Sequence, residues 1–140
     1  MSTLARRSLE RRLAYRTSRN PTLRLLRELS RETQVTVWLV GGAVRNAALG
    51  LPGKDLDLVS GPGTRRLIPR IQEALQSKGH RFRKRGVTTW RFLGADDGLD
   101  LVDASRRGVE ADLRRRELTL NAIGYDLVEA RLNTPLMRSP

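Results

Sequence analysis

The chain has 140 residues and a mass of 15.8 kDa, a length that suits one domain. It contains no cysteine, which excludes a disulfide framework and a thiolate nucleophile. Its one histidine, His80, excludes a multi-histidine metal site and a hydrolase triad centred elsewhere. No apolar run approaches the roughly 20 residues of a membrane span. Its 24 arginines and three lysines stand against 15 acidic residues, and the net charge of +12 favours a polyanionic partner such as nucleic acid or an anionic membrane.

The N-terminal segment is basic and predicts two helices, over residues 3–17 and 22–32. Leu9 and Leu13 fall at helical spacing between arginines, and Pro21 breaks the first pattern. Nine arginines and three glutamates give residues 1–34 a charge of +6. We predict a basic helical extension over 1–34 that is a candidate RNA contact surface. An organelle transit peptide or a membrane-surface helix is the alternative interpretation.

The next hundred residues alternate between strand and helix patterns. A β-branched run predicts a strand over 35–40, and Gly50 closes a short helix that follows it. Pro69 is expected in the first turn of the next predicted helix, around residues 67–79, or at a kink within it. The remaining predicted elements are a strand at 54–59, a helix around 67–79, a basic strand or hairpin at 81–85, strands at 87–93 and 99–104, and a basic helical turn with an apolar stretch at 112–127.

This order of elements predicts an α/β (α+β) domain over residues 35–130, in which a mixed, mostly antiparallel sheet has flanking helices, followed by a short tail at 131–140. Three aromatic or heteroaromatic residues, His80, Trp38 and Trp90, are interpreted as structural, with Trp38 in a buried strand.

Acidic residues on two predicted strands are the first candidate site. Because strand side chains alternate, Asp55 and Asp57 share one face while the leucines beside them face the other way. Two adjacent carboxylates repel unless a cation lies between them, and oxygen donors favour Mg²⁺ or Mn²⁺. Asp100 offers a third carboxylate. Asp103 competes with it, although the strand period places it on the opposite face. A polar strand face is the alternative for the Asp55–Asp57 pair alone.

Two further motifs favour an anionic ligand. Gly41 and Gly42 separate a strand from a helix, so that free N–H groups at the helix start can attract phosphate, and Arg45 adds a positive charge. The motif is neither G-x-G-x-x-G nor a Walker A loop, and a tight turn is the alternative. The three consecutive arginines at 114–116 cannot share one helix face, so some of them are solvated or bind an anion.

Taken together, these motifs resemble a known family. Residues 37–46 (VWLVGGAVRN), with Asp55-Leu-Asp57, resemble the opening signature of the head domain of poly(A) polymerases and class II CCA-adding tRNA nucleotidyltransferases. Residues 112–123 (DLRRRELTLNAI) resemble the second signature of that family, and residues 99–102 (LDLV) resemble the strand between them that carries a third acid. The order and spacing agree over residues 37–127.

The resemblance implies a polymerase-β-like nucleotidyltransferase fold and the metal-dependent transfer of a nucleotide from ATP or CTP to an RNA 3′ end. Asp55, Asp57 and Asp100 match the catalytic, metal-binding carboxylates. The positions that match nucleotide binding are Gly41, Gly42, Arg45, Arg115, Arg116 and Asn121. The implied partners are Mg²⁺ or Mn²⁺, ATP or CTP, and an RNA of the tRNA type, and a cytoplasmic protein without a membrane partner is expected.

The chain also departs from the family pattern. Asn46 and Glu117 stand where the family usually has Asp, and Leu118 replaces a common aromatic. We expect the neck, body and tail domains of the family to be absent, with a second chain as one source of neck and body. The alternative function is a catalytically impaired head domain that binds RNA or a protein partner.

Overall fold

The computed structural model describes residues 2–51, 55–84, 86–93, 98–106 and 123–133. The described helices are α1 (Thr3–Arg19), α2 (Pro21–Thr33), α3 (Gly42–Leu49) and α4 (Thr64–Leu75). The described strands are β1 (Val37–Val40), β2 (Asp55–Ser60), β3 (His80–Lys84), β4 (Val87–Leu93), β5 (Gly98–Asp103), β6 (Gly124–Asp126) and β7 (Arg131–Asn133). No described helix is long and apolar enough to cross a membrane.

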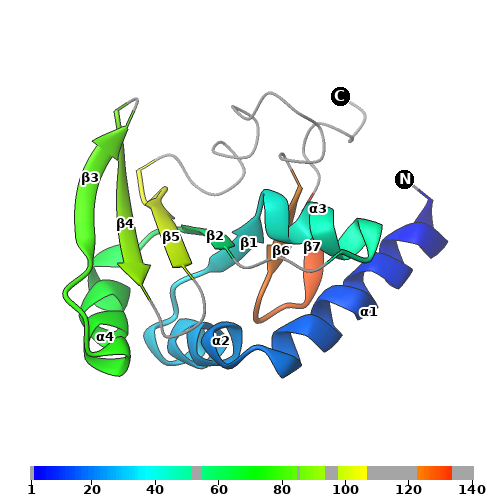
Figure 1. Ribbon diagram of the computed structural model, residues 1–140, viewed down its shortest axis with the longest axis horizontal. Helices are drawn as coiled ribbons and strands as arrows, with labels where there is room; N and C mark the ends of the chain where they lie inside the picture. Colours follow the sequence, from blue (N-terminus) through cyan, green and yellow to red (C-terminus); the bar gives the residue numbers. More distant parts are fainter. Residues whose placement is uncertain (1, 52–54, 85, 94–97, 107–122, 134–140) are drawn as a thin grey trace.

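The described strands form one seven-stranded sheet in the order β3-β4-β5-β2-β1-β6-β7 (Figure 1). Neighbouring strands pair antiparallel except β2 and β5, which are parallel. The mixed, mostly antiparallel sheet with flanking helices confirms the predicted fold class. The β6–β7 pair was not predicted, and β7 falls in the segment assigned to the tail.

Local sequence signals set the helix boundaries at the N-terminal end. The Ser2 hydroxyl accepts a hydrogen bond from the Ala5 N–H at 3.0 Å, which caps α1. Asn20 caps α2 in the same way through the Leu23 N–H, and Pro21 takes the first helical position, where its missing N–H costs nothing. The predicted break at Pro21 is therefore confirmed. Pro69 lies inside α4, beyond its first turn, so the first-turn prediction is wrong.

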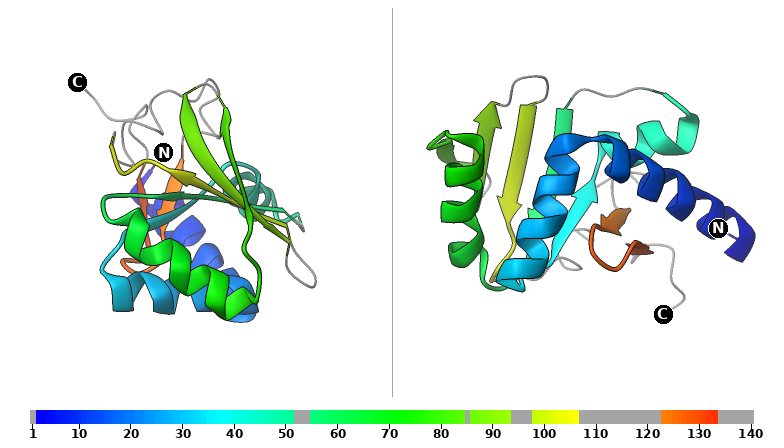
Figure 2. Two further views of the ribbon diagram at one scale, coloured as in Figure 1. Left: turned by 90° about the vertical axis from the view of Figure 1, so that its left-hand side faces the viewer. Right: turned by 90° about the horizontal axis from the view of Figure 1, so that it is seen from below.

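The main hydrophobic core lies between one face of the sheet and the helices. Leu13 of α1, Leu26 of α2 and Leu58 of β2 are all at most 1% exposed in one continuous cluster. Figure 2 shows α2 and α4 against the same side of the sheet. The basic N-terminal helices thus bury most of their leucines in the same core as the strands, while most of their arginines lie on the other faces of the helices.

Polar contacts also fasten α1 to the end of the sheet. The Glu10 carboxylate accepts a hydrogen bond from the Leu132 N–H of β7 at 2.8 Å, and Arg6 donates to the Leu132 carbonyl. Farther along α1, Arg16 donates to the carbonyl of Leu51 beyond α3. Part of the N-terminal positive charge therefore serves internal contacts.

The second face of the sheet carries a smaller apolar cluster. Val40, Val59 and Ala104 are buried there, and the partly buried Trp38 and Val102 pack against them. The alternation along β2 that sends its leucines into the main core sends its aspartates to this second face. We call it the aspartate face.

Candidate active site

One row of side chains crosses the aspartate face. The parallel register of β2 and β5 makes Asp57 and Asp100 direct partners, and the antiparallel register of β1 and β2 puts Val40 beside Asp57. Because partners in register project to the same face, the carboxylates of two strands meet there. In strand order the row runs His80, Arg91, Asp100, Asp57, Val40.

Asp55 and Asp57 lie on the same strand two residues apart, so the structure places both on this face. Asp55 is exposed, and Asp57 is half-buried. A glycine lies against each of them: a Cβ added to Gly98 would come within 3.1 Å of Asp55 Oδ1, and one added to Gly41 within 3.1 Å of Asp57 Oδ2. The two glycines therefore leave the space that these carboxylates occupy.

The glycine loop between β1 and α3 joins the carboxylates to a helix N-terminus. Gly41 precedes α3 with φ +65° and ψ −134°, a conformation that side-chain-bearing residues rarely adopt, and as the N-cap residue it has no side chain to cap the helix. The exposed Arg45 reaches back, so that its Nη2 would lie 3.3 Å from a Cβ on Gly42. The N–H groups of the first helical turn, which have no partner within the helix, and the Arg45 guanidinium suit an anion bound next to Asp57.

Arg91 is a member of this site that was not predicted. It donates from Nε to Asp100 Oδ1 at 2.9 Å and from Nη2 to Oδ2 at 3.2 Å, a bidentate pair. The hydrogen bond to Asp100 and then its negative charge raise the pKa of Arg91, with smaller contributions from Asp55 and Asp57 and a small opposing effect of desolvation. The negative charges of Asp100, Asp55 and Asp57 thus all stabilise the charged form of Arg91.

The pairing of Arg91 could have been found from the sequence. The hairpin between β4 and β5 pairs Leu93 with Gly98, and continuing that register outward pairs Arg91 with Asp100.

The donor set suits a hard divalent cation, since all of its members are carboxylates. In the part of the chain that the structure describes, however, no group of three or more acidic, histidine or cysteine side chains is arranged to hold a metal ion. Asp55 and Asp57 are the pair that would hold one, while Asp100 is engaged by Arg91. Each Asp100 oxygen accepts one hydrogen bond from Arg91 and keeps a second lone pair.

The structure places Asp103 outside this cluster. Asp103 lines a hollow with Ile68 of α4, on the opposite face from Asp100 as strand alternation predicts, and its carboxylate accepts from the Ser105 N–H. Arg115, Arg116 and Asn121 lie outside the described residues, as does most of the predicted segment over 112–127.

The predicted structural residues divide into two groups. Trp90 packs against the main core and Trp38 is partly buried in the cluster on the aspartate face. His80, in contrast, is exposed on that same face and stacks on Phe82. It was not predicted there because the pairing of β3 with β4, which brings it beside Arg91, is not visible in the β3 sequence alone.

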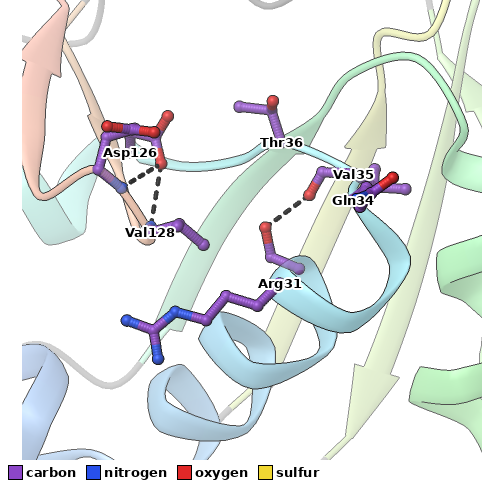
Figure 3. Close-up of a pocket in the computed structure, with 8 residues that line it drawn as sticks. Arg31, Gln34, Val35, Thr36, Asp126 and Val128 are labelled. Atoms are coloured by element: carbon purple, nitrogen blue, oxygen red, sulfur yellow. Dashed lines mark hydrogen bonds between the residues drawn. The ribbon is translucent and has the colours of Figure 1, made fainter.

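Two hollows among the described residues lie away from Asp55, Asp57 and Asp100. One of about 310 Å³ lies between the end of α2 and the β6–β7 turn, at the end of β1 remote from Asp57 (Figure 3). Two of its polar side chains are engaged: Asp126 accepts from the N–H groups of Val128 and Glu129, and the Ser30 hydroxyl donates to the Val35 carbonyl.

Comparisons of sequence and of structure with known proteins both identify similarity to tRNA nucleotidyltransferases. The sequence profile of the poly(A) polymerase head domain matches residues 37–136. A CC-adding tRNA nucleotidyltransferase from Geobacter sulfurreducens is 33% identical over 119 residues, covering 83% of this chain and 27% of that protein. The chain spans little more than a quarter of the length of such relatives.

Solved structures agree on the fold. The Thermotoga maritima CCA-adding enzyme in complex with tRNA(CCA) superposes with a TM-score of 0.63 at 28% identity, over 77% of this chain and 27% of the enzyme. A CCA-adding enzyme in complex with ATP superposes with a TM-score of 0.66 at 26% identity, over 82% of this chain and 29% of the other.

Proposed function

The chain belongs to the poly(A) polymerase head domain family, and from that premise we propose that it is the catalytic head of an RNA nucleotidyltransferase. It would transfer a nucleotide from ATP or CTP to the 3′ end of a tRNA-like RNA, the chemistry named for its relatives. The observation that carries the proposal is the register that sets Asp57 beside Asp100, together with the Gly41 backbone, whose added Cβ would come within 3.1 Å of Asp57 Oδ2. Carboxylates and an anion-binding loop then meet at one place.

The triphosphate would bind at the glycine loop. The N–H groups at the start of α3, which have no partner within the helix, and the positive end of the helix dipole favour negatively charged oxygen. Arg45 supplies a full positive charge over the same loop. Arg115 and Arg116 are further nucleotide ligands in this proposal, and Asn121 belongs to the same signature. A bound divalent cation, held by Asp55 and Asp57 and joined by Asp100, would supply charge neutralisation at the reacting phosphate.

The proposed reaction is an in-line displacement. The 3′-hydroxyl oxygen of the RNA forms a bond to the α-phosphorus, and the bond from that phosphorus to the bridging oxygen of the β-phosphate breaks. Pyrophosphate leaves with the electron pair, and its charge is met by Arg45 and the helix N-terminus. An Asp100 oxygen accepts the proton of the attacking hydroxyl, while Arg91 holds that carboxylate in a fixed orientation.

A second candidate function is RNA or partner binding without catalysis. The Arg91–Asp100 pair favours it, because a guanidinium on the third carboxylate already provides positive charge that a cation would otherwise bring. Asn46, which removes a family acid next to Arg45, points the same way.

A nucleotide-incorporation assay separates the two candidates. The purified chain is incubated with Mg²⁺, radiolabelled ATP or CTP and short RNAs ending in C or CC, and extension is read on a gel. Metal-dependent extension that is lost on chelation supports catalysis. RNA binding without incorporation of either nucleotide would instead support the binding function.

A further inference from the structure

Two stacked rings lie on the aspartate face beyond Arg91. His80 and Phe82 of β3 have ring centroids 5.7 Å apart with an interplanar angle of 24°. His80 is exposed and Phe82 is half-buried. The guanidinium carbon of Arg91 lies 5.2 Å from the Phe82 centroid, so the rings, the guanidinium and Asp100 form one continuous surface.

Core packing does not account for these rings. Neither His80 nor Phe82 belongs to either buried cluster, whereas the other phenylalanine of the chain, Phe92, is 0% exposed in the main core. The side chains that alternate with them on β3 point to the other face, where Arg81 lines a hollow beside α4. In a chain with only 4% aromatic residues, an exposed ring stacked on a half-buried ring beside the Arg91–Asp100 pair therefore indicates a ligand with a flat face.

The strand order fixes which ligand this is. The glycine loop lies on the β1 side of the carboxylates, and the rings lie on the β4 and β3 side. In-line displacement requires the attacking hydroxyl and the leaving pyrophosphate on opposite sides of the reacting phosphorus. If the triphosphate occupies the glycine loop, the RNA acceptor must approach over β4 and β3. His80 lies three strand spacings from Asp57, roughly 14 Å. The last bases of the RNA acceptor can span this distance.

We propose that His80 and Phe82 form a stacking platform for the terminal bases of the single-stranded RNA acceptor. The proposal rests on the function proposed above and adds the path of the RNA. Stacking on aromatic side chains is tolerant of base identity, because every base has a π-face, and Arg91 adds positive charge beside the platform. The net charge of +12 complements the RNA backbone.

The test follows the terminal base directly. A short RNA with 2-aminopurine at its 3′ end is titrated with the full chain at low salt, without nucleotide or metal, and the fluorescence of that base is recorded. We expect quenching on binding, and we expect the Phe82→Leu and His80→Ala variants together to lose the quenching and to bind about fivefold or more weakly. Tyr15→Leu is the matched control, since Tyr15 is an exposed ring on α1, and it should keep the quenching.

A second arm measures the affinity of a fluorescent ATP analogue for the same variants, with thermal melting to verify folding. Unchanged nucleotide affinity is expected. Loss of nucleotide affinity with retained quenching would overturn the proposal, because the rings would then hold the incoming base. An RNA that is not quenched by the unmodified chain, or is not bound, would also overturn it. Quenching without nucleotide incorporation would leave the platform intact and refute the catalytic function instead.

Discussion

Arg91 holds both carboxylate oxygens of Asp100, at 2.9 Å and 3.2 Å, in the middle of the row that crosses the aspartate face. The pair is formed by residues on adjacent antiparallel strands and is partly open to solvent. The Arg91 guanidinium therefore occupies the carboxylate to which the family resemblance assigns metal binding. Competition between Arg91 and a divalent ion for the Asp100 carboxylate can be measured.

Replacement of Arg91 by Gln should strengthen divalent-cation binding. The substitution removes the positive charge that competes for Asp100 and repels a cation from Asp55 and Asp57. Because the pair is exposed, the expected gain in Mn²⁺ affinity is only about two- to fivefold, measured by titration calorimetry. Arg83→Gln, on β3 and bonded only to the Gly86 carbonyl among the described contacts, is the control. Equal or weaker Mn²⁺ binding by Arg91→Gln would show that Asp100 does not share in cation binding.

Gly41 should be essential to the site, unlike Gly50 at the other end of α3. Ala at position 41 must adopt φ +65° with ψ −134° and bring its Cβ within 3.1 Å of Asp57 Oδ2, so we expect a loss of about 1–3 kcal/mol in unfolding free energy and loss of nucleotide incorporation. Gly50→Ala also has positive φ, but its Cβ meets nothing within 4 Å. It should cost about 1 kcal/mol and leave incorporation intact. Equal activity of the two variants would refute the role of the glycine loop.

Much of this site was visible in the sequence because strand alternation is a local property. The spacing of Asp55 and Asp57 places them on one face wherever β2 lies in the sheet, and the three-residue offset of Asp103 from Asp100 places it on the other. The structure agrees on both points. The strand order is not local, and the position of Asp100 directly beside Asp57 depends on the pairing of β2 with β5.

Two features escaped prediction for other physical reasons. β6 and β7 have three residues each, too short for a period to stand out, and Gly124 and Asn133 are residue types typical of turns. α1 was predicted as an extension because its arginines dominate its composition, yet Leu9 and Leu13 are buried in the main core. The assignments of Arg115, Arg116 and Asn121 stay predictions.

Glu10 should matter more to stability than its position in a basic helix suggests. Glu10→Ala leaves the partly buried Leu132 N–H without its acceptor, which should cost about 1–3 kcal/mol in unfolding free energy. Glu28→Ala removes only the exposed pair with Arg31 on α2 and should cost about 0.2–0.5 kcal/mol. Urea denaturation of the two variants checks the difference. Equal costs would mean that the hydrogen bond between Glu10 of α1 and Leu132 of β7 adds nothing to the unfolding free energy.

Tyr125 should make the fold sensitive to alkali. Burial, followed by the negative charge of Glu10, raises the pKa of this phenol from 10.0 to about 12, with Arg27 opposing the shift. Below pH 10 the phenol is protonated in both states, so it has no effect. Between pH 10 and 12 only the unfolded chain loses the proton, so the unfolding free energy falls as pH rises through that window.

The ionisation of Tyr125 is observable on its own in the Tyr15→Phe variant, because the chain has two tyrosines. Phenolate absorbance should rise near pH 12, and Tyr125→Phe should remove this part of the pH dependence of stability. A midpoint near pH 10 in the folded protein would contradict the buried position of the ring.

The central claim, that the carboxylates of the aspartate face catalyse nucleotide transfer, is tested most directly by single-turnover extension of a short RNA with Asp57→Asn. This substitution keeps the shape of the side chain and removes the charge beside Asp100 and Gly41. Asp103→Asn, on the opposite face, is the matched control. We predict that the unmodified chain and Asp103→Asn extend the RNA in a Mg²⁺-dependent reaction, while Asp57→Asn loses at least 100-fold in rate, about 2.7 kcal/mol. Extension by Asp57→Asn at the unmodified rate would contradict the assignment of the active site.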